Sequence, residues 1–136
     1  MTPLQLVDLA IEARERAYVP YSHFAVGAAL LTGSGKVYQG CNIENSSFGA
    51  TNCAERTAFF SAVYEGERDF TAIAVVGGPE GERVHELCPP CGICRQVMQE
   101  FSPEMEVICL NGVGDAKAFS LKELLPYGFD HNWLDR

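Results

Sequence analysis

Two cysteine-containing stretches constrain the fold of this chain more than any other feature of its sequence. Residues 51–60 contain Cys53, and residues 88–96 contain Cys91 and Cys94. In both stretches a polar or proline-containing run leads into apolar residues, which predicts that each begins a helix. The N-terminus of a helix presents free N–H groups and a partial positive charge, so it favours a thiolate over a thiol. A fold that brings the two helix starts together could therefore hold three thiolates around one cation.

Zinc is the cation that this set of donors indicates, because zinc prefers sulfur ligands. A catalytic zinc keeps three protein ligands and one open position, and Glu55 offers a carboxylate near Cys53 that could move protons. A structural zinc needs a fourth ligand, which Cys88 could supply, and the spacing alone does not decide between the two sites. The two prolines that follow Cys88 hold it in extended geometry, away from the helical face that Cys91 and Cys94 share. This geometry favours the catalytic site.

The remaining cysteines, Cys41 and Cys109, lie in apolar, strand-like runs, where we predict buried free thiols. Six cysteines could also form a disulfide framework, but that framework requires an oxidising compartment. The N-terminal residues have neither the basic start nor the apolar run of a signal peptide, so we expect a cytoplasmic protein. No segment approaches the roughly 20 apolar residues that cross a bilayer, so we expect no membrane partner.

The charge of the chain argues against a nucleic-acid partner. With 18 Asp and Glu against 10 Lys and Arg, the formal net charge is −8, and the basic residues form no cluster. Nucleic-acid affinity comes mainly from basic residues that contact phosphates. The sequence also has no internal repeat or linker, so residues 1–136 are expected to form one domain that is long enough to bury a core.

Hydrophobic periodicity and turn residues predict the element order α-β-β-α-β-α-β, followed by a tail. Capping boxes at residues 2–5 and 120–123 mark two helix starts, and Phe119 is expected in a last edge strand. The alternation of strands and helices predicts parallel crossovers, with the two cysteine-bearing helices starting at one edge of the sheet. The predicted helices span about residues 3–18, 53–65 and 90–101, and the predicted strands span residues 24–31, 36–41, 71–76 and 106–110.

The cysteine motifs and the segments around them resemble the zinc-dependent cytidine deaminases. Residues 53–55, Cys-Ala-Glu, and residues 90–94, Pro-Cys-Gly-Ile-Cys, resemble the C-A-E … P-C-x-x-C signature of that family. The segments 21–30, 40–45 and 94–97 resemble family members as well, and the match is closest to the short, homotetrameric, three-cysteine class. This resemblance implies an α/β fold of three α-β-α layers around a mixed, mostly five-stranded sheet, and it implies assembly as a homotetramer.

The resemblance also implies the chemistry of the site. Cys53, Cys91 and Cys94 would bind one zinc ion per chain, whose fourth ligand is the water that becomes the hydroxide nucleophile. Glu55 would take the proton of that water and later protonate the ring nitrogen and the leaving ammonia. The implied reaction is hydrolytic deamination of cytidine and 2′-deoxycytidine to uridine and 2′-deoxyuridine, a step of pyrimidine salvage.

Five further residues resemble the substrate-binding positions of the family. Asn42 and Glu44 would bind the ribose hydroxyl, Phe24 would pack against the base, and the backbone of Ala54 would hold the base edge. Phe129 resembles an aromatic residue that reaches into the pocket of a neighbouring subunit. From the residues alone, Asn42 could instead be a turn residue and Phe24 a core residue.

Arg56 and Phe48 are two further positions for which the resemblance has consequences. Three thiolates and a hydroxide exceed the charge of a zinc ion, and Arg56 resembles the arginine that draws electron density from the sulfurs in three-cysteine members. The alternative is a surface arginine on a solvated helix face. Phe48 is counted among the substrate-binding positions. Many family members carry a tyrosine there, contributed by the adjacent subunit, and Phe48 lacks the hydroxyl group that this tyrosine would use for a contact.

Two other functions remain open on the sequence. The chain could be a related zinc deaminase that acts on another aminopyrimidine nucleoside, although Asn42 and Glu44 argue for a substrate with a ribose. It could also be a zinc-stabilised binding module without turnover, in which replacement of Glu55 by alanine would be silent. A chain with a net charge of −8 attracts phosphorylated substrates weakly, so the expected small-molecule partner is a free nucleoside.

Overall fold

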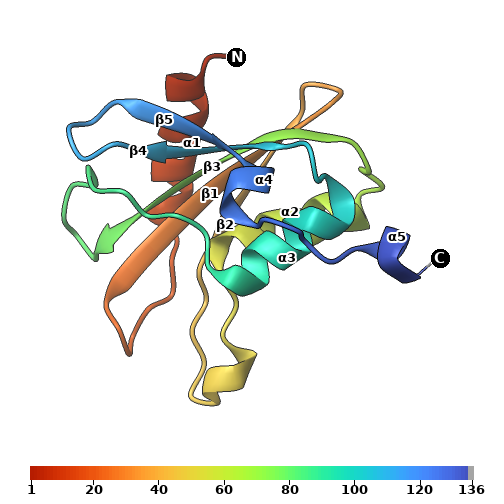
Figure 1. Ribbon diagram of the computed structural model, residues 1–136. Helices are drawn as coiled ribbons and strands as arrows, with labels where there is room; N and C mark the ends of the chain where they lie inside the picture. The colour runs from red at the N-terminus through yellow and green to blue at the C-terminus, as the bar shows by residue number, and fades with distance from the viewer. Residues whose placement is uncertain (135–136) are drawn as a thin grey trace.

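Residues 1–134 are described by the computed structural model, in which a mixed five-stranded sheet carries helices on both faces (Figure 1). The element order confirms the predicted α/β class. Within residues 1–134, none of the helices has the length and apolarity to span a bilayer. The elements are α1 (Pro3–Arg14), β1 (Phe24–Thr32), β2 (Val37–Cys41), the 3-10 helix η1 (Phe48–Ala50), α2 (Ala54–Tyr64), β3 (Phe70–Pro79), α3 (Gly92–Phe101), β4 (Glu106–Leu110), β5 (Ala116–Ser120), α4 (Leu121–Leu124) and α5 (His131–Leu134).

The strand order in the sheet is β2-β1-β3-β4-β5. Strand β1 is antiparallel to both β2 and β3, β3 is parallel to β4, and β4 is antiparallel to β5. The predicted parallel crossover is therefore confirmed for β3-α3-β4. Strands β2 and β3 also run in the same direction, but β1 lies between them, so the connection through α2 joins strands that are not neighbours.

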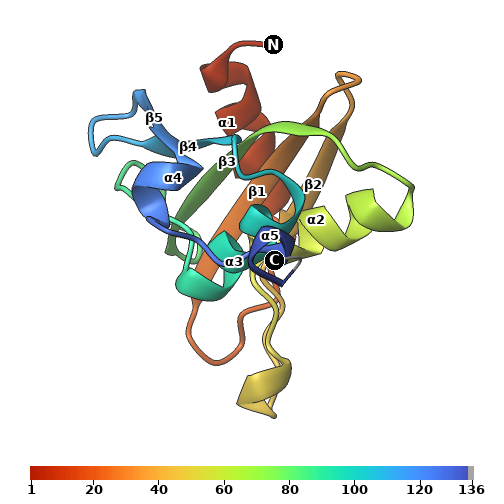
Figure 2. The same ribbon diagram turned by 45° about the vertical axis from the view of Figure 1, so that its right-hand side comes forward.

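The two faces of the sheet are buried under different helices, which gives three layers (Figure 2). Alternate residues of β3 point to opposite faces: Ile73 packs into the core under α2 and α3, and Ala74 packs into the core under α1. Phe59 of α2 is fully buried in the first of these cores. The ring of Phe59 lies 5.0 Å from the ring of Phe70, measured between centroids. A helix layer on each side explains why β3 is apolar on both faces.

Two element boundaries differ from the sequence-based prediction. Helix α1 ends at Arg14 rather than near Tyr18: the amides of residues 15–17 bind carbonyls three residues earlier, and the amide of Tyr18 donates to the carbonyl of Asn42 at 3.0 Å. Strand β3 continues past the predicted end at Val76, because residues 77–79 pair with the first residues of β1. Pro79 ends the strand, at a position where no further backbone N–H is needed to pair with β1.

Arg14 closes α1 with a buried side chain. Its guanidinium group, in a residue that is 5% exposed, donates to the backbone carbonyls of Ala25, Gly78, Pro79 and Glu82 at 2.6–3.0 Å. These bonds tie the C-terminal end of α1 to the start of β1 and to the end of β3.

Candidate functional site

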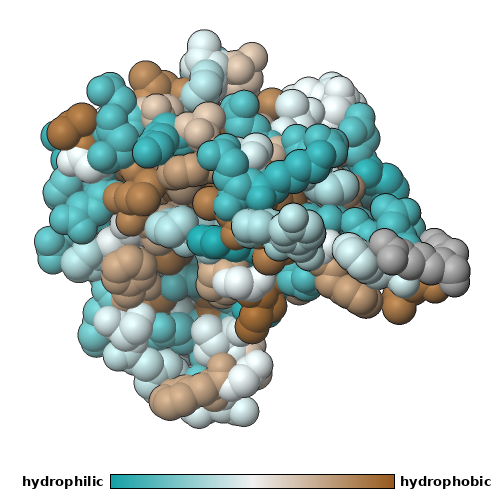
Figure 3. Space-filling model, in the orientation of Figure 1, coloured by the Kyte–Doolittle hydropathy of each residue, from teal (hydrophilic) through white to brown (hydrophobic). Residues whose placement is uncertain are grey.

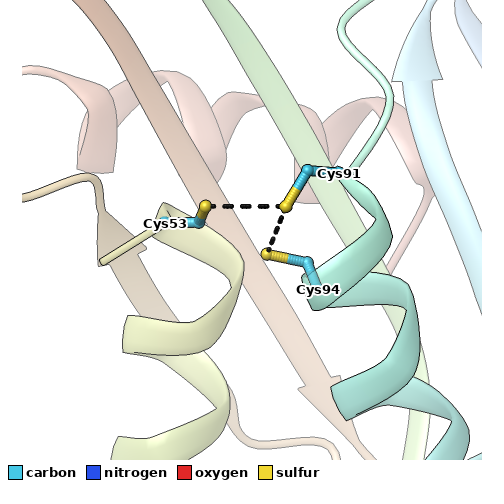
Figure 4. Close-up of side chains that lie close together, drawn as sticks. All are labelled: Cys53, Cys91 and Cys94. Atoms are coloured by element: carbon cyan, nitrogen blue, oxygen red, sulfur yellow. Dashed lines mark hydrogen bonds between the residues drawn. The ribbon is translucent and has the colours of Figure 1, made fainter. Parts of the chain in front are cut away.

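Helices α2 and α3 begin side by side at one edge of the sheet, as predicted (Figure 4). They follow β2 and β3, which run in the same direction, so both helices start at the same end of the strands. Cys53 is the N-cap of α2 and Cys91 is the N-cap of α3, and both have extended backbone dihedral angles. Neither cysteine side chain makes a capping hydrogen bond. The two sulfur atoms are therefore directed away from their own helices and toward each other.

Three cysteine sulfurs meet at this point, and we call Cys53, Cys91 and Cys94 the sulfur cluster. The Sγ atoms of Cys53 and Cys91 are 3.7 Å apart, those of Cys91 and Cys94 are 3.5 Å apart, and all three lie within 4.8 Å of one another. A tetrahedral ion with bonds of about 2.3 Å to sulfur holds its sulfur ligands about 3.8 Å apart. The separations in the cluster match that geometry, so the cluster can hold one zinc ion with a position left open.

The charge of the cluster is set by Arg56 as well as by the cysteines. Interaction with the Cys94 thiol, followed by a hydrogen bond from Arg56, lowers the pKa of the Cys53 thiol to about 5. The Nη2 atom of Arg56 lies 3.3 Å from the sulfur of Cys53. The same proton-sharing interaction raises the pKa of Cys94. One thiolate is thus stabilised by Arg56, while three thiolates at this spacing require a cation among them.

Glu55 lies in the first turn of α2 and is only 4% exposed. Burial, with a smaller contribution from the negative charge of Cys53, raises the pKa of its carboxyl group to about 7. A cation held by the sulfur cluster would favour the carboxylate form. Because Cys53 is the cap residue and not part of the regular helix, Cys53 and Glu55 can both face the same site. A carboxyl group with a pKa near neutrality can accept and release protons there.

The other cysteines lie outside the sulfur cluster. Cys88 is half-buried, and burial raises the pKa of its thiol to about 11. Cys109 is a fully buried free thiol, as predicted, whereas Cys41 is free but only half-buried. Cys41 differs from the prediction because it ends an edge strand, where its thiol donates to the carbonyl of Arg16 at the surface.

Asn42 and Glu44 hold the segment that leads into β1. The Oδ1 atom of Asn42 accepts a hydrogen bond from the amide of Val26, and its Nδ2 atom donates to the carbonyl of Phe24, both at 2.9 Å. One carboxylate oxygen of Glu44 accepts from the amides of Tyr21 and Ser22 at 2.9 and 3.1 Å. This support for β1 was missed from the sequence, because residues 21–26 and 42–44 are far apart along the chain. An amide group has four hydrogen-bonding sites and a carboxylate has two oxygens, so both side chains retain capacity for a ligand.

Phe24 and Ala54 occupy opposite kinds of environment. Phe24 is 42% exposed, so the structure does not bury it in the core. It lines a cavity of about 210 Å³ together with Gly77 and Leu87. Ala54 is fully buried as the first residue of α2.

Phe48 and Phe129 are both exposed aromatic residues. Phe48 lies in η1, at the tip of a loop that projects from the sheet, and it is 78% exposed (Figures 1 and 2). Phe129 lies between α4 and α5 and is 54% exposed. Figure 3 shows hydrophobic residues at the surface beside this C-terminal part of the chain. Cys91 is exposed as well, so one side of the sulfur cluster lies at the surface of the chain.

Three polar residues of α3 are structural features that the sequence analysis missed. Arg95, Gln96 and Gln99 bind the chain that follows α4, with hydrogen bonds at 2.7–2.9 Å. The sequence analysis marked Arg95 and Gln96 only as part of the family resemblance of residues 94–97, because their bonding partners lie about 30 residues away in the sequence.

Comparisons with known proteins agree with this geometry. A family model described as cytidine and deoxycytidylate deaminase zinc-binding region matches residues 2–110, which include the sulfur cluster. A cytidine deaminase of Halalkalibacterium halodurans is 54% identical over 125 residues, which cover 91% of this chain and 91% of that protein. A blasticidin-S deaminase of Bacillus cereus is 33% identical over 132 residues, covering 95% of this chain and 93% of that protein. A crystal structure of cytidine deaminase from Burkholderia pseudomallei has a TM-score of 0.86 and 52% identity, covering 95% of this chain and 100% of that chain.

Proposed function

This chain belongs to the zinc-binding cytidine and deoxycytidylate deaminase family, and from that premise we propose that it hydrolyses cytidine and 2′-deoxycytidine to uridine and 2′-deoxyuridine. The chain is a zinc-dependent deaminase with one zinc ion. The observation that carries the proposal is the position of Glu55, a buried carboxyl group beside three sulfurs spaced for a tetrahedral ion. Such an arrangement suits hydrolysis at a carbon atom that bears an amino group.

The metal would be held by Cys53, Cys91 and Cys94. When bound, zinc supplies a Lewis acid that lowers the pKa of water to about 7 and so makes water a nucleophile at neutral pH. Three thiolates would reduce this effect, because their negative charge neutralises that of the ion. The hydrogen bond from Arg56 to the sulfur of Cys53, together with the N-termini of α2 and α3, withdraws electron density from the sulfurs.

Glu55 would move the protons of the reaction. Its carboxylate accepts a proton from the attacking water and delivers it to the pyrimidine ring nitrogen. It then carries a second proton to the amino group, which leaves as ammonia. The ring carbon that bore the amino group gains the oxygen of water and loses the amino nitrogen, so no external oxidant or reductant is needed. Burial of Glu55 raises the pKa of its carboxyl group, which opposes the effect of a cation held by the sulfur cluster and favours a group that can also hold a proton.

The nucleoside would be bound by residues at the start of β1 and in the loop after β2. We assign the ribose hydroxyl to Asn42 and Glu44, the face of the base to Phe24 and the edge of the base to the backbone of Ala54. The partial exposure of Phe24 and the unused hydrogen-bonding capacity of Asn42 and Glu44 support this assignment. These two side chains would then have a double role, because they also hold the backbone that carries Phe24.

The site would be completed by neighbouring copies of the chain in a homotetramer. Phe48 and Phe129 are large and exposed, which suits residues that enter the pocket of another subunit. The exposed Cys91 leaves room for them. The single sheet formed by residues 1–134 supports one deaminase domain spanning residues 1–136. The cytoplasmic location stays a prediction.

A direct assay tests the function. Purified protein with zinc is incubated with cytidine or 2′-deoxycytidine, and conversion to the uridine form is followed by ultraviolet absorbance. Glu55→Ala is compared at equal zinc content, with Glu100→Ala as a control, because Glu100 is an exposed carboxylate of α3. We expect turnover by the wild type and the control, and a loss of about 10³-fold in rate for Glu55→Ala. A silent Glu55→Ala variant would instead favour a zinc-stabilised binding module.

The second candidate is deamination of another aminopyrimidine nucleoside. It is favoured by the 33% identity to the blasticidin-S deaminase of Bacillus cereus, although the identity to the cytidine deaminase of Halalkalibacterium halodurans is 54%. Blasticidin S is therefore included in the same assay. Turnover of blasticidin S without turnover of either cytidine nucleoside would replace the first assignment by the second.

A further inference from the structure

The last residue of α4 and the chain that follows it are bound to α3 at three points. We call residues 124–134 the C-terminal segment. The Nη1 atom of Arg95 donates to the carbonyl of Leu124 at 2.7 Å, and the Nε2 atom of Gln96 donates to the carbonyl of Phe129 at 2.7 Å. Figures 1 and 2 both show the segment passing along α3 before it enters α5.

The strongest anchor of this segment is a buried pair, Gln99 and Asp130. The Nε2 atom of Gln99 donates to the Oδ2 atom of Asp130 at 2.9 Å, and the two residues are 8% and 9% exposed. The second carboxylate oxygen of Asp130 accepts from the amide of Asn132 and so begins α5. A buried carboxylate is tolerated only where donors satisfy it, so the pair holds the segment in one position.

Together, these bonds fix the backbone at one aromatic residue and at the residue that follows it. The carbonyl of Phe129 is held by Gln96, and the next residue, Asp130, is held by Gln99. The ring of Phe129 nevertheless remains 54% exposed. A fixed backbone with an exposed ring limits the directions in which that ring can point.

The helix that makes these bonds is also the helix that carries two sulfurs of the cluster. Cys91 is the N-cap of α3, and Cys94 lies in its first turn. Arg95 strengthens the link, because its Nε atom donates to the carbonyl of Pro90 at 2.8 Å. The C-terminal segment is therefore positioned on the same rigid element as the metal ligands.

We propose that Gln99 and Asp130 are positioning residues that set the direction of the Phe129 ring, so that the ring packs against the nucleoside bound in a neighbouring subunit. This inference rests on the proposed function and on the shared pocket. It assigns a role to two buried polar residues that touch neither the sulfur cluster nor the nucleoside. Their effect is on substrate affinity, because Phe129 takes no part in proton transfer.

The test exchanges the two polar groups. Gln99→Glu places two carboxylates in contact in a buried site and repels Asp130. The double variant Gln99→Glu/Asp130→Asn restores the hydrogen bond with donor and acceptor reversed. We expect Gln99→Glu to raise the KM for cytidine about tenfold while kcat stays within about twofold and the zinc content per chain is unchanged. The double variant should return KM toward the wild-type value.

Tryptophan fluorescence reports the position of the segment without any turnover. Trp133 is the single tryptophan of the chain, and its Nε1 atom donates to the carbonyl of Gly128. Release of the segment should shift its emission to longer wavelength and increase quenching by acrylamide in Gln99→Glu, and the double variant should reverse both changes. If cytidine is not a substrate, this measurement still tests the anchor, so failure of the anchor and failure of the proposed function are distinguishable.

Two further variants separate positioning from simple packing. Gln99→Met removes the donor without adding charge, and it serves if Gln99→Glu does not fold. Phe129→Ala should raise KM to a similar degree, and combining it with Gln99→Met should add little, because both changes remove the same contact. An unchanged KM and an unchanged Trp133 spectrum in Gln99→Met would overturn the proposal. A silent Phe129→Ala beside a raised KM in Gln99→Met would overturn it as well.

Discussion

Replacement of Gly40 by alanine should damage the metal site from the opposite side of α2. Gly40 lies in β2 beneath the first turn of that helix. A Cβ atom added there would overlap the carbonyl oxygen of Ala54 and would lie 2.6 Å from the amide nitrogen of Ala58. Both contacts are with backbone atoms, so no side chain can rotate away to relieve them.

The size of the displacement follows from these distances. Ordinary van der Waals contact begins at 3.4 Å, so the start of α2 must move by about 0.8 Å to accept the methyl group at Ala58. Zinc–ligand distances tolerate only about 0.2 Å. Cys53 is the N-cap of α2 and moves with the helix. We therefore expect Gly40→Ala to weaken zinc binding at least about tenfold and to lower the free energy of unfolding by about 2 kcal/mol.

Gly27→Ala is the matched control. A Cβ atom on Gly27 would overlap the carbonyl oxygen of Ala10 and lie 2.5 Å from the amide nitrogen of Arg14, both in α1 on the other face of the sheet. This variant should lose stability while its zinc affinity stays within about threefold of the wild type. Zinc affinity is measured by competition with a chromophoric chelator, and stability by urea unfolding of the zinc-loaded protein. Equal loss of zinc in both variants would refute the reasoning, because the effect would then follow from stability and not from the position of α2.

Three other outcomes can be checked with the same assays. Cys53→Ser should lose zinc and activity, whereas Cys88→Ser should keep both, because Cys88 lies outside the sulfur cluster; metal analysis of the purified variants decides this. Arg14→Met should lower the free energy of unfolding by about 3 kcal/mol in urea, since it leaves buried backbone carbonyls without their donors, and it should not change the zinc content. Dilution of the wild type until sedimentation shows only monomers should abolish turnover of cytidine, and a fully active monomer would contradict the shared pocket.

The fold was predictable where local chemistry decides the outcome. The capping boxes at Thr2 and Ser120 formed as expected, because their partners lie three residues away. Helix α1 was predicted too long and β3 too short, because the partners at these ends are not local in the sequence. The carbonyl that accepts a hydrogen bond from the amide of Tyr18 belongs to Asn42, and the residues that extend β3 pair with β1. These partners are distant in sequence, so hydrophobic periodicity does not contain them.

The candidate site also has features that local sequence predicts and features that depend on distant parts of the chain. The cysteine spacing and the helix starts predicted that Cys53, Cys91 and Cys94 meet, since a helix N-terminus and the i, i+3 spacing of Cys91 and Cys94 are local properties, but the spacing left open whether Cys88 joins them. They left open whether Cys53 is a cap residue and whether Glu55 shares its site. The structure places Cys53 at the N-cap and buries Glu55 beside it, because β2 and β3 run in the same direction and carry α2 and α3 to one edge of the sheet.

The sequence by itself indicated zinc, the donor atoms and the family resemblance, because thiolates are preferred ligands of zinc and the motifs that carry the resemblance are local patterns. Only the tertiary structure decided the raised pKa of Glu55, the second role of Asn42 and Glu44, and the anchor formed by Gln99 and Asp130. Each of these depends on burial or on a partner supplied by another part of the chain. Burial and long-range pairing arise only when the layers pack, so no local pattern in the sequence records them.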